Sequence, residues 1–174
     1  MKILKKFACL FLCVAVLSTL FAFSVSADTG RMSGVSKKNS GNIVTDFSLT
    51  WSNNAKNGWV WWSTKTTYQG QASTTWLGDS PFYADSIVHN NIIKCDKIGG
   101  SFSVTASGDP SLGITVTSDS TSTTYSYSDT DIWDLTVDFE YSTSVSGFLR
   151  QSQDFKSTGT VKLGSRFYAT DTGW

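Results

Sequence analysis

The chain of 174 residues has very few of the side chains on which most enzyme active sites depend. His89 is its only histidine and Glu140 its only glutamate. A Ser-His-Asp triad would have to be built around His89, but no nucleophile motif lies beside it. A pair of His89 with Cys95 fails on distance, because residues six apart on a regular strand are about 20 Å apart. The composition therefore argues against nucleophilic catalysis.

The acidic residues do not form the pairs that glycoside hydrolysis or metal binding requires. Two catalytic carboxylates must face each other across a cleft, whereas Asp134, Asp138 and Glu140 alternate along one stretch and are expected on one solvated strand face. Asp129 and Asp131 offer oxygen ligands for Ca²⁺, but their spacing matches no known calcium loop, and Asp is common in turns. We therefore expect no enzymatic activity, no bound metal and no cofactor.

Cysteine is also scarce, with three residues in the chain. Cys9 and Cys13 lie in the first 27 residues, so Cys95 alone remains in the rest and no intrachain disulfide can form there. We expect Cys95 to be buried, and burial alone must stabilise the domain. Lys and Arg together number 14, as do Asp and Glu, so the basic patch of a nucleic-acid-binding protein is not expected.

The first 27 residues have the pattern of a secretory signal peptide. Three lysines among the first six residues precede an almost unbroken apolar run over residues 7–23, and small residues lead up to Ala27. We expect cleavage between Ala27 and Asp28. The apolar run is at the short end for a membrane span. We therefore expect a secreted or cell-surface protein with no transmembrane segment after cleavage.

What the remaining 147 residues have in abundance is alternation of apolar with polar side chains, about a third of them Ser or Thr. Turn residues recur about every ten positions, which predicts nine or ten short strands. The expected fold is an all-β antiparallel sandwich over residues 42–174, with a small β-barrel as the alternative, after a flexible lead over residues 28–41. The clearest strand predicts five core residues at alternate positions: Trp133, Leu135, Val137, Phe139 and Tyr141.

Residues 84–95 fit two different patterns. Their apolar residues suit one face of a short amphipathic helix, and Ser80-Pro81 would suit its start. Several of these residues are β-branched, however, and Asn90-Asn91 interrupts both patterns. We favour two short strands on either side of a kink or bulge at the asparagines.

The stretch from Gly58 to Tyr68 contains three of the seven tryptophans. As a strand it would place Trp59, Trp61 and Lys65 on one face and Trp62 on the other. It follows a turn that ends in Asn-Gly, so we expect an antiparallel hairpin with the strand over residues 42–51. A strand with large aromatics on both faces is either covered on both sides or shows indole to solvent or a ligand.

These tryptophans suggest a carbohydrate-binding surface. Sugars stack their apolar faces on exposed Trp or Tyr rings, and polar side chains orient them. The candidate residues are Trp59, Trp61 and Lys65, with Trp76 close to them in the sequence. The competing interpretation is that these tryptophans are core residues. The partner would be a polysaccharide or the cell-wall surface.

Two further functions fit the same features. The alternation over Ser101 to Tyr127 is similar in pattern to the hairpins that pore-forming proteins insert into membranes, although an ordinary sandwich hairpin has the same period. An exported structural protein without a specific ligand is the third possibility. The general pattern is that of a small exported bacterial β-protein.

Overall fold

A computed structural model of the chain describes residues 24–57, 61–107, 113–119 and 121–173. One turn of 3₁₀ helix, η1 (Asn39–Gly41), accompanies eight strands. The strands are β1 (Ser24–Lys38), β2 (Ile43–Asn57), β3 (Trp61–Trp76), β4 (Ala84–Ser107), β5 (Gly113–Ser118), β6 (Ser122–Ile132), β7 (Asp134–Leu163) and β8 (Arg166–Gly173). Within these described ranges, no helix has the length and apolar character to cross a membrane.

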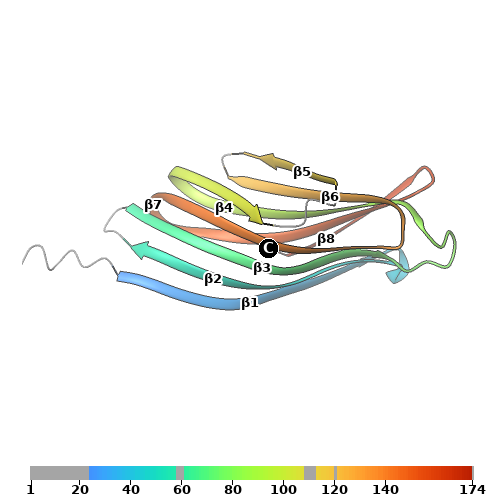
Figure 1. The fold of residues 1–174 in the computed structure, drawn as a ribbon, viewed down its shortest axis with the longest axis horizontal. Helices are drawn as coiled ribbons and strands as arrows, with labels where there is room; N and C mark the ends of the chain where they lie inside the picture. The colour runs from blue at the N-terminus through green and yellow to red at the C-terminus, as the bar shows by residue number, and fades with distance from the viewer. Residues whose placement is uncertain (1–23, 58–60, 108–112, 120, 174) are drawn as a thin grey trace, which may run out of the picture.

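The strands form two antiparallel sheets of five strands each (Figure 1). The first sheet has the order β1-β2-β3, then the first half of β7, then the second half of β4. The second has the order β5-β6, then the first half of β4, the second half of β7, and β8. The described strands do not close into a barrel, so the expected antiparallel sandwich is confirmed. Because β4 and β7 each serve both sheets, eight strands supply ten strand segments.

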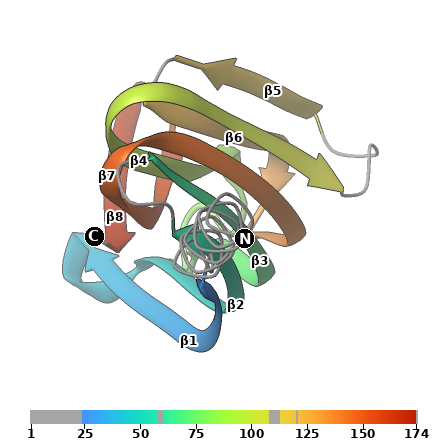
Figure 2. The ribbon, with the colours of Figure 1, turned by 90° about the vertical axis from the view of Figure 1, so that its left-hand side faces the viewer.

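The two long strands bend together where they pass from one sheet to the other. The register of β4 with β7 shifts between Asp96 and Ser101, and Figure 2 shows both ribbons curving at this corner. Gly100 has φ +76° here, and a Cβ on it would overlap the carbonyl group of Ser146. Only glycine suits both the left-handed backbone and this close approach of two strands.

The core lies between the sheets and is centred on Phe155 of β7. Phe155 stacks on Phe139 at 5.2 Å between ring centroids and contacts Phe47 at 5.1 Å. Phe139 and Phe155 belong to the two halves of β7, so this strand folds over and packs against itself. Full burial of one such side chain stabilises the fold by about 1.5–3 kcal/mol.

Residues 28–41 differ from the expected flexible lead. Residues 24–38 form β1, which pairs with β2 along its whole length. Gly30 and Gly34 lack the side chain that would collide with the rings of Trp51 and Phe47. The glycines that made this segment resemble a loop are therefore packing residues, and they let aromatic rings lie against the strand backbone.

Residues 84–95 are neither a helix nor two strands separated at the asparagines. They form one uninterrupted part of β4, and the irregularity lies further along the chain, between Asp96 and Ser101. His89 and Asn91 point into the core and are fully buried with hydrogen-bond partners. Because the core satisfies these polar groups, the strand continues through the asparagines.

Trp133 also differs from the prediction. The four other residues of its predicted core face are buried, but Trp133 is 50 % exposed. It precedes β7, which begins at Asp134, and lies just after Asp131, whose φ is +54°. The chain turns at this corner, so the alternation of β7 does not extend back to Trp133.

Candidate functional site

Two of the four predicted ligand-binding residues, Lys65 and Trp76, have described side chains, and these two lie far apart. Lys65 is exposed on the outer face of β3, whereas Trp76 lies eleven residues further along the same strand and faces the core. That spacing corresponds to about 36 Å. Trp59 lies outside the described residues, and Trp61 begins β3 opposite Phe148, with its side chain also outside what the structure describes.

Trp76 is a core residue that supports a loop. Its side chain is 5 % exposed, and its indole Nε1 donates a hydrogen bond of 2.7 Å to the carbonyl oxygen of Pro81. A Cβ on Gly78 would overlap the indole ring, so the loop after β3 lies directly over it. The ring faces of Trp76 are not open for stacking on a sugar.

An exposed apolar cluster lies beside Trp76, at the end of the molecule on the right of Figure 1, where η1 is drawn. We call it the aromatic end. It combines the loop between β3 and β4 with the corner between β6 and β7. Its members, with their exposed fractions, are Leu77 (56 %), Phe82 (65 %), Tyr83 (50 %) and Trp133 (50 %).

Backbone hydrogen bonds hold the segments of the aromatic end together. The amide of Trp76 donates to the carbonyl of Trp133 at 2.7 Å, and the amide of Leu77 donates to the carbonyl of Asn42 at 2.6 Å. Ala84 pairs with Ile132, which places Tyr83 next to Trp133 at the ends of β4 and β6. The backbone at Leu77 and Trp133 is therefore held by hydrogen bonds, and Tyr83 directly precedes the paired residue Ala84.

Two of the rings also order each other. Phe82 and Tyr83 make an edge-to-face contact with 4.8 Å between ring centroids. The carboxylate of Asp85 accepts a hydrogen bond of 2.6 Å from the amide of Gly164 and so ties the start of β4 to the β7–β8 turn. Asp79 and Asp131 add exposed carboxylates nearby in the chain. The surface thus combines aromatic rings with hydrogen-bond acceptors.

The other acidic residues of interest have structural partners. Asp134 accepts hydrogen bonds from the hydroxyls of Thr75 and Thr136, and Asp138 accepts one from the amide of Gln71. Asp129 accepts a hydrogen bond from the next backbone amide, as Asp commonly does in turns. The described part of the chain contains no group of three His, Cys, Asp or Glu residues placed to hold a metal ion.

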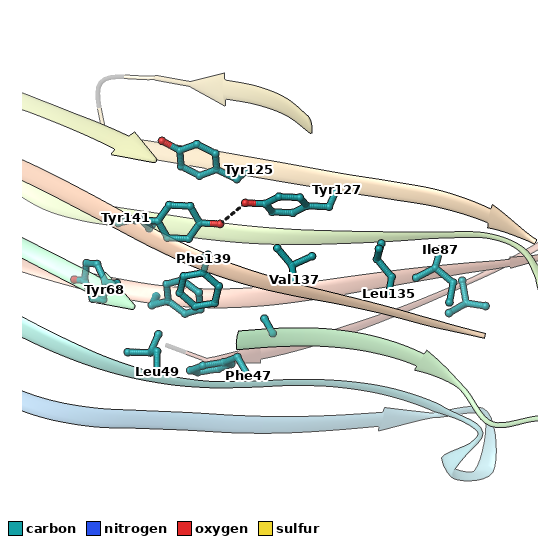
Figure 3. Close-up of a cluster of buried hydrophobic side chains, with 14 of the residues drawn as sticks. Phe47, Leu49, Tyr68, Ile87, Tyr125, Tyr127, Leu135, Val137, Phe139 and Tyr141 are labelled. Carbon is teal, nitrogen blue, oxygen red and sulfur yellow. Dashed lines mark hydrogen bonds between the residues drawn. The ribbon is translucent and has the colours of Figure 1, made fainter. Parts of the chain in front are cut away.

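His89 belongs to a polar network inside the core. Its Nδ1 lies 2.8 Å from the hydroxyl of Thr74, and its Nε2 lies 3.0 Å from Oδ1 of Asn91. Asn91 donates in turn to the hydroxyl of Tyr141, which lies 2.8 Å from that of Tyr127 (Figure 3). Burial lowers the pKa of His89 to about 4. The imidazole is neutral and fully buried, and therefore out of reach of a substrate.

The neutral ring has one tautomer that satisfies every partner. The amide of Asn91 must donate through Nδ2 to Tyr141, so its Oδ1 accepts from His89 and from the hydroxyl of Ser157. Nε2 of His89 therefore carries the proton, and Nδ1 accepts from Thr74. The network continues from Thr74 through Thr45 to Thr170 and links the two sheets.

No protein-family model and no curated protein matches the chain. Sequence patterns missed the aromatic end because Phe82 and Tyr83 belong to a loop without periodicity. The one available sign was a pair of aromatic residues directly after Ser80-Pro81, at a place where no alternation of apolar and polar residues predicts that they are buried.

Proposed function

We propose that this protein is a secreted, non-catalytic β-sandwich that binds cell-envelope polysaccharide through the aromatic end. The observation that carries the proposal is the exposure of Phe82, Tyr83 and Trp133, each at least half open to solvent, around the hydrogen-bonded backbone of Trp76 and Trp133. Exposed rings on a rigid scaffold bind at a low entropic cost, because little has to be ordered on binding.

The chemistry of the aromatic end suits a neutral saccharide. Sugar rings stack their C–H faces on aromatic rings, and their hydroxyls need hydrogen-bond partners around the stack. The exposed carboxylates of Asp79 and Asp131 accept hydrogen bonds from such hydroxyls. The same carboxylates repel anionic polymers, so a neutral glycan is the better ligand for this surface.

The absence of catalysis is part of the proposal. His89 is buried and neutral, and Asp134 and Asp138 are engaged with neighbouring side chains on the sheet surface. Export rests on the amino-terminal pattern, with cleavage expected between Ala27 and Asp28. That cleavage would leave β1 from Asp28 to Lys38 in place.

Binding to a panel of insoluble neutral polysaccharides tests the proposal. The double variant Phe82→Ala/Trp133→Ala should lose most of the binding, since stacking on both open rings is removed. Val116→Ala is the matched control, because Val116 is also exposed but lies on β5. A second double variant, Trp59→Ala/Trp61→Ala, shows whether the tryptophan-rich strand contributes to polysaccharide binding in addition to the aromatic end. Wild-type protein that binds none of the panel, or full binding by Phe82→Ala/Trp133→Ala, contradicts the proposal.

A membrane-active role is the second candidate, because aromatic residues on protruding loops also favour membrane interfaces. The described parts of this segment, residues 101–107, 113–119 and 121–127, belong to the sandwich, however, and Tyr125 and Tyr127 are buried in the core. Insertion would therefore require the core to open. Dye release from liposomes distinguishes this role, and inactivity in both assays would favour a structural protein.

A further inference from the structure

We propose that the outer face of the first sheet carries a second binding site, which takes a saccharide bearing an anionic group, either carboxylate or phosphate. The site is a groove over β1, β2 and β3, with Arg31 and Lys65 as its cationic contacts. It shares with the function proposed above only the general class of ligand, because it lies on a different surface and uses different residues.

The groove is formed by two neighbouring rows of side chains across three paired strands. Arg31 pairs with Thr50, which pairs with Gln69. The next row along the strands runs from Thr29 through Ser52 to Thr67 in the same way. Residues at alternate positions share one face of a sheet, so all six side chains point outward. Together with Gly30 and Trp51 they line a groove of about 510 Å³.

The lining of the groove is chemically suited to a polyhydroxylated ligand. The hydroxyls of Thr29, Ser52 and Thr67 and the amide of Gln69 can each donate and accept hydrogen bonds, as sugar hydroxyls do. The hydroxyl of Thr50 already donates to the carbonyl of Gln69 at 3.3 Å, so its lone pairs remain available. No carboxylate is among the lining residues.

Arg31 supplies the preference for an anion. Its side chain is exposed, and it makes no ion pair with any other described residue. A guanidinium offers paired N–H donors that match a carboxylate or a phosphate. Lys65 lies on the same face, one row beyond Thr67, and is also exposed. The strand and sheet spacings place the Cα atoms of Arg31 and Lys65 about 16 Å apart, so two charged groups of one extended chain can be engaged.

Acidic groups lie on both edges of the groove and limit where an anionic group can bind. Glu140 pairs with Gln69 from β7, and Asp138 lies one row away, hydrogen-bonded to Gln71. On the opposite edge, Asp28 accepts a hydrogen bond from the amide of Thr29. Glu140 would repel an anionic group near Gln69, so one anionic group is expected at Arg31 and a second at Lys65, four residues from Gln69 along β3.

Affinity electrophoresis with soluble polymers tests this site. The probes are polygalacturonate for carboxylate, polyglycerol phosphate for phosphate, and a neutral β-glucan. Arg31→Ala should weaken binding to at least one anionic probe about fivefold and leave the neutral probe unaffected. Arg31→Lys should restore part of the affinity, and Glu140→Gln should raise it.

Arg166→Ala is the matched control, because Arg166 is an exposed arginine on β8, outside the groove. It should bind the anionic probes as the wild type does. Equal losses in Arg31→Ala and Arg166→Ala would show attraction by net charge alone and overturn the site, as would a wild type that binds neither anionic probe. The variant Phe82→Ala/Trp133→Ala should keep its binding to the anionic probe, so failure of the aromatic end and failure of the groove give different patterns.

Discussion

His89 is a titratable side chain that is buried in the core in its neutral form. Every polar atom of its ring has a hydrogen-bond partner, and its Nε2 proton is oriented by Asn91. Desolvation is the largest effect on its pKa and lowers it, whereas the hydrogen bond to Asn91 and the charges of Asp46 and Asp134 act in the opposite direction. Burial therefore outweighs the attraction of the carboxylates.

The lowered pKa makes stability depend on pH in a defined window. An unfolded histidine takes up a proton near pH 6.5, but folded His89 does so only near pH 4. Between these values the unfolded state binds more protons, so acid favours unfolding. Stability is unaffected by His89 above about pH 6.5 and falls by about 3 kcal/mol as the pH drops to 4.

Because His89 is the only histidine, its titration can be followed directly. The ring resonances in an NMR titration should shift near pH 4, and urea unfolding should show the loss of stability below pH 6.5. His89→Gln keeps a neutral polar group and should flatten the slope of stability between pH 4 and 6.5. A ring that titrates near 6.5 in the folded protein would contradict the buried, neutral assignment.

At the scale of elements, the corner in β4 and β7 decides whether two sheets form. β4 must change direction within a few residues, and it does so where Gly100 lies against the backbone of Ser146. A backbone contact cannot be relieved by moving a side chain. A substitution here strains both the φ angle of residue 100 and the approach of the two strands.

Gly100→Ala should therefore lower the free energy of unfolding by about 3 kcal/mol or more. Gly164→Ala is the control, because Gly164 also has a positive φ, +60°, but a Cβ there meets no atom within 4 Å. It should cost only about 1–2 kcal/mol, the penalty of the left-handed conformation. Chemical denaturation of both variants gives the comparison, and equal losses would show that the close approach at Gly100 is not tight.

The elements that the sequence predicted are those whose alternation of side chains matches their burial. Leu135, Val137, Phe139 and Tyr141 alternate with polar residues and are buried as expected. β1 was missed because two of its inward positions are Gly30 and Gly34, which bury no side chain of their own. The rings they accommodate come from β2, so the packing of β1 is visible only once the two strands are paired.

At the scale of the whole molecule, the candidate surfaces could not be read from sequence because they depend on register and on the meeting of distant loops. Arg31, Thr50 and Gln69 are neighbours only through the pairing of three strands. Trp133 meets the loop before β4 only because both sheets end there. Of the predicted ligand-binding residues, Lys65 lies on the same outer face as the groove residue Thr67.

Also at the scale of the whole molecule, no disulfide joins the residues that the structure describes, and the accessibility of the Cys95 thiol measures how the fold opens. Cys95 is fully buried in β4, immediately before the corner at Asp96 to Ser101. If the corner is as tightly packed as Gly100 indicates, a thiol reagent reaches Cys95 only when the sandwich unfolds as a unit. Labelling of the Cys95 thiol by Ellman's reagent should then be negligible in buffer. It should rise with urea in parallel with the change in tryptophan fluorescence that marks the loss of tertiary structure. Rapid labelling without denaturant would instead show local opening at the corner, and Gly100→Ala should increase the labelling rate more than Gly164→Ala does.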